Sequence, residues 1–142
     1  MASQNRIIDY NKILEIRNRD NIYARDLGIV VTALGDGYAE SQLVLEPRHR
    51  NLIGSVHGGC LFTMADTTGG AAATSCGNYV TTSTGQISYL SPAIDTEKIL
   101  ARAEVMKAGK RLIVAEVKLY DDHKKLLCIG IFEYARLPKE IG

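Results

Sequence analysis

Residues 51–76 read NLIGSVHGGCLFTMADTTGGAAATSC, and this stretch decides how the rest of the chain is arranged. It contains no lysine, arginine, glutamate or proline, and after its opening loop it has the spacing of a helix. Small and apolar side chains fall on both faces of that helix; one face carries Leu61, Met64, Ala65, Thr68 and Ala72, and the other carries Phe62, Gly69, Gly70 and Ala73. A helix that is apolar all round is usually buried. We therefore expect a central buried helix whose glycines mark a close approach by other backbone or by a ligand.

One carboxylate, Asp66, interrupts this apolar helix, and His57-Gly58-Gly59 opens it. A carboxylate in an apolar setting is unfavourable unless it is paired, hydrogen-bonded or used in chemistry. The free N–H groups at a helix N-terminus carry partial positive charge, and glycines leave them accessible to a ligand oxygen. These features indicate a candidate site that combines a carboxylate with an oxyanion-binding helix end.

The spacing between His57 and Asp66 affects how such a site is assembled. Nine residues correspond to about two and a half helical turns, so on one helix the two side chains would face opposite ways, roughly 13 Å apart along the axis. A symmetric dimer could bring the His57 end of one chain to Asp66 of the other. The count fails if His57 lies in the loop before the helix.

Composition limits the classes of protein that this chain can be. Its 142 residues, 46% hydrophobic and 23% charged with a net charge of +1, are typical of one globular domain over residues 1–142. We expect no nucleic-acid partner, because there is no basic surplus, and no membrane span, because no apolar run approaches about 20 residues. The first residues lack the apolar core of a signal peptide. Three cysteines form no CxxC pair, which favours a cytoplasmic protein with free thiols: Cys60, Cys76 and Cys128.

The N-terminal part, about residues 1–26, is expected to be a helical extension. Residues 5–18 have an amphipathic pattern, with apolar side chains inward (Ile7, Ile8, Tyr10, Leu14) and charged side chains outward (Arg6, Asp9, Lys12, Glu15, Arg17). Residues 18–26 are polar and form either a linker or a short helical turn around Ile22 and Tyr23.

Alternating side chains and turn residues predict six strands. They cover residues 28–34, 38–45, 80–90, 98–108, 111–121 and 126–134, and residues 137–142 are expected to be loose. Gly35-Asp36-Gly37 predicts a hairpin turn between the first two strands, and the last three strands form a meander. One buried helix beside one antiparallel sheet indicates an α+β fold in which the sheet curls around the helix.

The motif residues resemble those of a known family. Asn51, Gly54 and His57-Gly58-Gly59, with Asp66 nine residues after the histidine, resemble the pattern of hotdog-fold acyl-CoA thioesterases, most closely the phenylacetate-degradation (PaaI-like) type. Residues 85–93 (GQISYLSPA) and 107–110 (KAGK) are similar to that family's next strand and hairpin. The resemblance covers about residues 27–136. It implies a hotdog fold, with a curved antiparallel sheet wrapped around the central helix.

The resemblance also implies a role for each motif residue. Asp66 would be the nucleophile, or the general base that activates water. Gly59 would offer its backbone N–H to the thioester oxygen, with Gly58 nearby, and His57 and Asn51 would orient the thioester or the water. The hydroxyl that the family often has beside the carboxylate would come from Thr82, with Ser83 as the adjacent alternative.

The same resemblance implies a substrate and an assembly. The substrate would be an acyl-CoA or aryl-acyl-CoA thioester, so coenzyme A is part of the substrate and no cofactor or metal is needed. The chain would form a dimer with two sites at its interface, commonly doubled to a tetramer. Lys110 and Arg111, with Lys107, could bind the phosphates of coenzyme A, and Arg48 with Arg50 is another basic pair that could do so.

Other interpretations of these residues remain open. Asp66 could be a structural residue satisfied by neighbours, His57 a capping residue, and the glycine pair a flexible turn. Cys60, three residues after His57, could form a Cys–His pair, although small buried cysteines usually serve packing. The function could instead be that of a non-catalytic acyl-CoA binding module, or of a hotdog hydratase or dehydratase. The latter enzymes have a histidine a few residues after the aspartate, and here none lies between Asp66 and His123.

Overall fold

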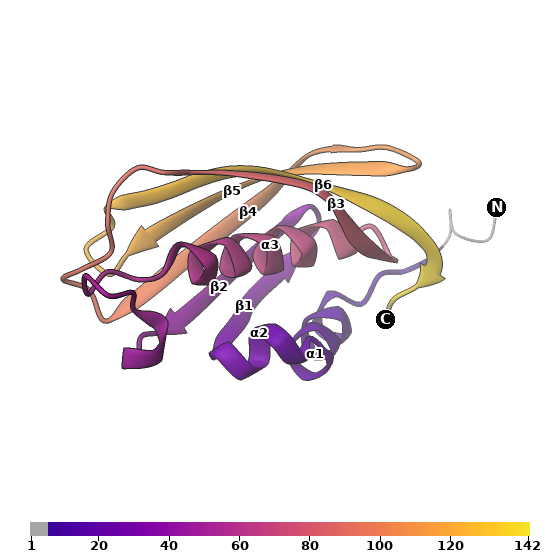
Figure 1. The fold of residues 1–142 in the computed structure, drawn as a ribbon. Helices are drawn as coiled ribbons and strands as arrows, with labels where there is room; N and C mark the ends of the chain where they lie inside the picture. The colour runs from indigo at the N-terminus through magenta and orange to yellow at the C-terminus, as the bar shows by residue number, and fades with distance from the viewer. Residues whose placement is uncertain (1–5) are drawn as a thin grey trace.

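The computed structural model describes residues 6–142, in which a strongly curved antiparallel sheet wraps around one long helix (Figure 1). The elements are α1 (Tyr10–Asp20), α2 (Ile22–Leu27), β1 (Ile29–Gly35), β2 (Tyr38–Val44), a 3-10 turn (Pro47–His49), α3 (Gly58–Thr74), β3 (Asn78–Tyr89), β4 (Lys98–Ala108), β5 (Leu112–Asp121) and β6 (Leu126–Glu140). This confirms the α+β prediction. Within the described residues, no helix has both the length and the apolar character needed to cross a membrane.

The six strands form one sheet in the order β1-β2-β4-β5-β6-β3, with every neighbouring pair antiparallel. The predicted hairpin joins β1 to β2 and the predicted meander is β4-β5-β6. The strand that follows α3 crosses to the far edge, where β3 pairs only with β6. Most of β3 after Val80 is exposed, so this edge of the sheet is uncovered in the single chain.

The central helix α3 begins within one residue of the predicted histidine-glycine opening and packs against β2, β3, β4 and β5. From Met64 to Thr74 every side chain except Asp66 is buried. Phe62, Thr63 and Asp66 are half-buried, and they line a cavity between α3, strands β3 and β6, and the N-terminal helices. The sequence prediction of a helix buried on nearly every face is therefore confirmed, and its open side locates the cavity described below.

The N-terminal extension differs from its prediction in where its first helix starts and in which residue is buried, and it agrees with the prediction in its second helix. Helix α1 starts at Tyr10, because the Asp9 side chain caps it by accepting a hydrogen bond from the Lys12 N–H at 3.1 Å. Ile7 is 92% exposed rather than inward, and Ile13 is the fully buried residue of the helix. The polar segment after α1 forms the short helix α2, as in the second of the two predicted alternatives. The predicted helix start at residue 5 and the first five residues of the extension lie outside the described residues.

The expectation of a loose tail is wrong. Strand β6 continues to Glu140, which pairs with Asn78 at the start of β3. Ile141 is 1% exposed, and its N–H donates to the Gly77 carbonyl at 3.0 Å. Arg6, predicted to point outward, donates to the carbonyls of Gly77 and Ile141. The last residues are thus ordered by long-range pairing, which local sequence patterns do not reveal.

Candidate active site

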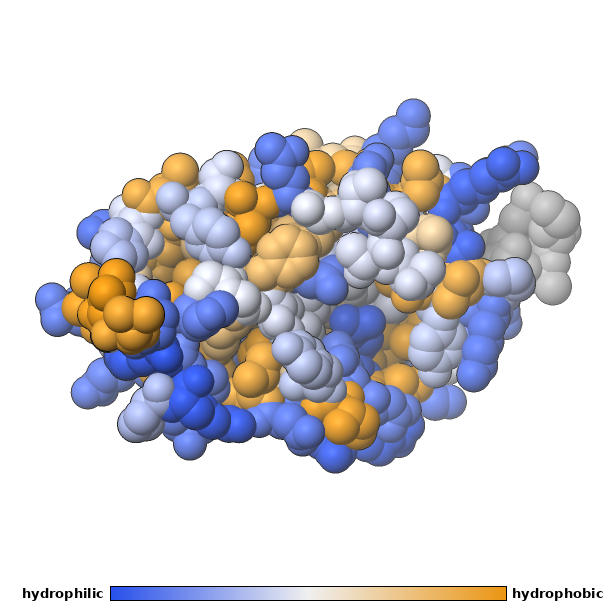
Figure 2. Space-filling view, in the orientation of Figure 1, coloured by the Kyte–Doolittle hydropathy of each residue, from blue (hydrophilic) through white to orange (hydrophobic). Residues whose placement is uncertain are grey.

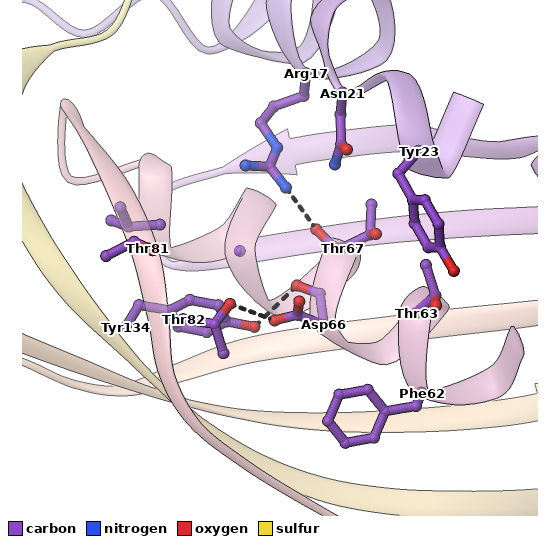
Figure 3. A pocket seen from close by; sticks show the side chains of 12 residues that line it. Arg17, Asn21, Tyr23, Phe62, Thr63, Asp66, Thr67, Thr81, Thr82 and Tyr134 are labelled. Carbon is purple, nitrogen blue, oxygen red and sulfur yellow. Dashed lines mark hydrogen bonds between the residues drawn. The ribbon is translucent and has the colours of Figure 1, made fainter. Parts of the chain in front are cut away.

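A cavity of about 360 Å³ opens beside the middle of α3 (Figure 3). Its walls come from five elements: α1, α2, α3, β3 and β6. The lining includes aromatic, aliphatic and hydroxyl side chains with two charged residues, and consists of Arg17, Asn21, Tyr23, Phe62, Thr63, Asp66, Thr67, Gly70, Val80, Thr81, Thr82 and Tyr134. Most of these side chains carry a polar group, so this pocket is more polar than the usual small-molecule site.

Asp66 is held in this cavity by two neighbours on adjacent strands. The Thr82 hydroxyl donates to the Asp66 carboxylate (Oδ1) at 2.7 Å, and the Tyr134 hydroxyl donates to the Asp66 backbone carbonyl at 2.9 Å. Thr82 and Tyr134 are partners in the β3–β6 register. Burial raises the pKa of the Tyr134 phenol above its ordinary value, so this hydroxyl remains a donor. The two strands therefore fix both the side chain and the helical turn of Asp66.

Thr82, and not its neighbour Ser83, meets Asp66, although the strand is irregular at this point. The register shifts between Thr82 and Thr84, which leaves Ser83 as an additional residue in β3. Ser83 directs its hydroxyl to the Glu133 carbonyl at 3.2 Å and does not line the cavity. Of the two predicted alternatives, the structure brings Thr82 to the carboxylate and leaves Ser83 outside.

The glycine pair in α3 makes room for two large side chains. A Cβ at Gly69 would overlap the Tyr134 hydroxyl, and a Cβ at Gly70 would lie 3.1 Å from Nη2 of Arg17. The glycines were expected to mark a close approach by backbone or by a ligand, whereas in the structure the approaching groups are side chains of β6 and α1.

Arg17 is the clearest departure from the predicted site. Its side chain, expected to face solvent, reaches into the cavity, and Nη2 donates to the Thr67 carbonyl at 3.1 Å (Figure 3). Burial lowers the pKa of the Arg17 guanidinium, while the nearby Tyr134 and Asp66 oppose that effect. A guanidinium stays protonated in any case. A half-buried positive charge therefore lines the same cavity as the Asp66 carboxylate.

The N-terminus of α3 forms a second polar feature. His57 has extended backbone, with φ −60° and ψ 134°, and caps the helix: its Nδ1 accepts the Gly59 N–H at 2.8 Å. With Nδ1 as acceptor, the proton of a neutral imidazole is on Nε2. The Gly58 N–H has no hydrogen-bond partner within residues 6–142. The backbone N–H that is free to bind a ligand oxygen is therefore that of Gly58. The family resemblance had implied the Gly59 N–H as the main donor to the thioester oxygen.

The two polar features do not meet within one chain. His57 and Gly59 line a separate depression together with Arg48, His49 and Cys60, and it shares Tyr23 and Thr63 with the Asp66 cavity. His57 is not helical, so the predicted opposite orientation of His57 and Asp66 does not hold; both lie along the α2-facing side of α3. The separation does hold, because seven residues from Gly59 to Asp66 span about 10 Å of helix.

Three other predicted residues lie away from the cavity. Asn51 organises its own loop: its side chain donates to the Ser55 hydroxyl at 2.8 Å and accepts the N–H groups of Ile53 and Ser55 at 3.1 Å. Lys110 and Arg111 are exposed at the β4–β5 turn and line none of the cavities around α3. Their proposed roles in binding or orientation stay predictions.

The Cys–His alternative has little support in the geometry. Burial raises the pKa of the Cys60 thiol, and only the more distant Arg48 charge opposes this effect. A thiol with a raised pKa is a poor nucleophile. In addition, the His57 Nδ1 is already bonded to the Gly59 N–H. Within residues 6–142, no group of three or more His, Cys, Asp and Glu side chains is arranged to hold a metal ion.

Sequence reasoning missed Arg17 and Tyr134. Tyr134 follows the same inward alternation as Phe132 in β6, so its direction was readable, but its contact with α3 was not. Arg17 gave no signal, because an arginine on an amphipathic helix is normally solvated.

Comparisons with known proteins agree with this geometry. The Thioesterase superfamily model matches residues 53–128, more than half of the chain. Acyl-coenzyme A thioesterase 13 of Homo sapiens is 30% identical over 111 residues, covering 76% of this chain and 79% of that protein. The PaaI protein from the phenylacetic acid degradation operon of Escherichia coli superimposes with a TM-score of 0.86 at 25% identity, covering 94% of this chain and 96% of that chain. A conserved protein of Pseudomonas aeruginosa gives a TM-score of 0.77 at 32% identity, covering 81% and 93% of the two chains. The chain therefore belongs to the thioesterase superfamily, as a thioester hydrolase with the hotdog fold of the PaaI-like type.

Proposed function

We propose that this chain hydrolyses acyl-CoA thioesters to a free acid and coenzyme A. The observation that carries the proposal is the Asp66 carboxylate, which faces a ligand-sized cavity and is held there by the Thr82 hydroxyl at 2.7 Å. The printed names of two relatives, acyl-coenzyme A thioesterase PaaI and acyl-coenzyme A thioesterase 13, support the same substrate class.

The proposed chemistry uses the carboxylate in one of two ways. As a general base, Asp66 takes a proton from water while the water oxygen attacks the carbonyl carbon and the C=O electron pair moves to oxygen. The C–S bond then breaks, and the proton goes to the departing sulfur. As a nucleophile, Asp66 attacks the carbonyl carbon and the C–S bond breaks with release of the coenzyme A thiolate, which leaves a mixed anhydride that water hydrolyses. Thiolate is a good leaving group, so neither route needs a metal or another cofactor.

The developing negative oxygen would be stabilised at the N-terminus of α3. The Gly58 N–H has no partner within the described chain, and the Gly59 N–H becomes available when the His57 ring turns away. Fixed backbone donors at a helix end stabilise an oxyanion with little reorganisation. His57 would then be free to orient the thioester or the water, and Asn51 would hold the loop before the helix.

We propose that each complete site forms between two chains. The helix N-terminus and Asp66 are about 10 Å apart along one helix, too far for one thioester group. The uncovered β3 edge is a surface through which a second copy could extend the sheet. Leu52 and Ile53, 100% and 72% exposed, lie in the loop before α3, and Figure 2 shows an apolar cluster at that end of the molecule. A tetramer would be two such dimers.

Coenzyme A would lie outside the cavity, which is too small for it. A cavity of about 360 Å³ is near the lower end of the range for ligand pockets, roughly 300–1,000 Å³, and suits an acyl group. Lys110 and Arg111 are the proposed contacts for the phosphates. Three free cysteines are consistent with a cytoplasmic location.

The proposal is tested by thiol release from a panel of acyl-CoA thioesters, from acetyl to palmitoyl and including phenylacetyl, with calorimetric binding of coenzyme A alone in parallel. Turnover of at least one thioester is expected. Replacing Lys110 and Arg111 by Gln should raise KM for coenzyme A thioesters but not for N-acetylcysteamine thioesters, which lack the phosphates. The matched control replaces Lys124 and Lys125, at the exposed β5–β6 turn. Tight coenzyme A binding without turnover of any thioester would leave the binding-module interpretation in place of the enzyme.

A further inference from the structure

We propose that Arg17 is a positioning residue for Asp66: it fixes the helical turn that carries the carboxylate and supplies the positive charge that offsets negative charge in the cavity. The inference rests on the proposed function, because it assigns a residue to that same site. Arg17 lies outside residues 53–128, the part of the chain that the superfamily model matches. The N-terminal helix α1 would then belong to the active site.

The contacts of Arg17 are not those of a residue that serves packing alone. Nη2 donates to the Thr67 carbonyl, next in sequence to Asp66, at 3.1 Å. Nε is buried without a hydrogen-bond partner within residues 6–142, and Nη1 has none there either. Burying an unsatisfied donor on a charged group is unfavourable. A neutral side chain such as glutamine could donate to the Thr67 carbonyl with a smaller desolvation penalty. The positive charge of Arg17 therefore needs an explanation of its own.

The middle of α3 is held from both sides at consecutive carbonyls. Tyr134 from β6 binds the carbonyl of Asp66 at 2.9 Å, and Arg17 from α1 binds that of Thr67 at 3.1 Å. The adjacent glycines, Gly69 and Gly70, leave room for these two side chains. Since the Asp66 side chain leaves the same turn, this pair of contacts fixes the direction of the carboxylate.

Arg17 is also the only positively charged side chain that lines the Asp66 cavity in the described chain. The other titratable groups facing Asp66 are Tyr134 from β6 and Tyr23 from α2; α3 adds none there, and β3 contributes only Val80, Thr81 and Thr82. Glu133, next to Tyr134 in β6, bonds the Thr84 hydroxyl instead. During attack the negative charge passes from Asp66 to the oxyanion, and when the product acid ionises a second negative charge lies beside the restored carboxylate. A fixed cation there stabilises that state.

Three substitutions separate the charge of Arg17 from its hydrogen bond. Arg17→Met removes both, Arg17→Gln keeps a donor without charge, and Arg17→Lys keeps both. We expect kcat to fall about tenfold or more in Arg17→Met and Arg17→Gln, with KM changed less than about threefold, and to recover in part in Arg17→Lys. Arg19→Met, on the exposed face of the same helix, is the control and should keep wild-type kcat. Wild-type kcat in folded Arg17→Gln would overturn the proposal.

A second measurement does not depend on turnover. Urea unfolding of wild type, Arg17→Met, Asp66→Asn and the double variant gives the coupling between the two side chains. We expect the unfolding constants to depart from additivity by about fivefold or more, and Arg19→Met to show no coupling with Asp66→Asn. If the effects of the two substitutions on the unfolding constant are simply additive, the proposal is overturned. This result can be obtained even if Arg17→Met is too poorly folded for the activity assay. Coupling in a protein that hydrolyses no thioester would refute the proposed function while the pairing of Arg17 with Asp66 stands.

Discussion

At the scale of single residues, the behaviour of Asp66 depends on groups that are distant in sequence. Thr82 contacts its carboxylate, Tyr134 its carbonyl, and Arg17 the carbonyl of the next residue. None of these contacts is local to α3. The isolated α3 sequence would therefore present the carboxylate without the geometry that makes it useful.

Replacing Thr82 by Val should reduce activity without unfolding the chain. The substitution keeps the shape of the side chain and removes the 2.7 Å hydrogen bond to Asp66. Because Thr82 is exposed, stability should change by less than about 1 kcal/mol, whereas kcat should fall roughly 5- to 20-fold. Thr81→Val is the matched control, since Thr81 lines the cavity but makes no hydrogen bond to Asp66. Equal kcat values for the two variants would remove Thr82 from the mechanism.

Cys128 should make the chain less stable in alkali. Burial raises the pKa of its thiol from 9.0 to about 11. Between these values the unfolded chain loses the proton and the folded chain keeps it, so stability present below pH 9 is lost as the pH rises toward 11. Urea unfolding at pH 7.5 and 10.5 should show a loss of stability in wild type that is smaller by roughly 2 kcal/mol in Cys128→Ala, the remainder coming from other buried groups with a raised pKa, such as Cys60 and Tyr134. Cys76→Ala, at a half-buried thiol, is the control, and a loss unchanged in Cys128→Ala would contradict this assignment.

The residue scale also shows what the sequence can reveal. Asp66 was identifiable because a lone carboxylate in an apolar helix is unusual, and Thr82 because family spacing led to it. Arg17 was not identifiable, because the pattern of α1 predicts that this side chain faces solvent and only tertiary packing turns it into the cavity. The sequence identified His57 as a candidate for capping the helix. Its hydrogen bond with the Gly59 N–H depends on the side-chain rotamer and therefore could not be predicted from the sequence.

At the scale of elements, α3 tolerates its glycines because neighbouring elements use the space. Gly69→Ala would normally raise helix propensity by about 1 kcal/mol. Here the added methyl would overlap the Tyr134 hydroxyl and crowd Val117, so we expect a net loss of about 1–3 kcal/mol in the free energy of unfolding.

The double variant Gly69→Ala, Tyr134→Phe identifies the cause. Removing the hydroxyl should make the added methyl less costly than it is beside Tyr134, as measured by urea unfolding. If the cost of Gly69→Ala were the same in both backgrounds, the Tyr134 contact would not explain this glycine.

Helices and strands were largely predictable, but their ends were not. Periodicity located α3 and the meander, since both repeat over many residues. The tail of β6 was missed because its order comes from pairing with the start of β3. The bulge at Ser83 was also invisible, because alternating polar residues in β3 give no sign of a register shift.

At the scale of the whole molecule, the proposed function divides the active site into two parts that lie apart in the single chain. Asp66 lines one cavity, and Gly58, at the N-terminus of α3, lines another beside Tyr89. The shared site stays a prediction, and the spacing argument for it changes: His57 is not helical, so the two groups are separated along α3 rather than turned to opposite faces. Assembly depends on surfaces such as the β3 edge, whose partner no single-chain pattern specifies.

Mixing two inactive variants tests the shared site. Asp66→Asn removes the carboxylate, and Gly58→Pro removes the free N–H at the first helical position, where proline is tolerated. With free exchange, half of the dimers are mixed and each has one intact site, so about one quarter of wild-type activity should return. No recovery, despite exchange demonstrated with tagged chains, would place the whole site within one chain.

The most direct test of the central claim is thiol release by Asp66→Asn beside wild type, on the thioester that wild type hydrolyses fastest. The substitution keeps the shape of the side chain and an acceptor for Thr82 but removes the charge. We predict a loss of at least about 100-fold in kcat, roughly 2.7 kcal/mol of transition-state stabilisation, with the melting temperature close to that of wild type. A folded Asp66→Asn variant whose kcat lies within about fivefold of wild type would contradict the account, because the loss of transition-state stabilisation would then be well below 2 kcal/mol.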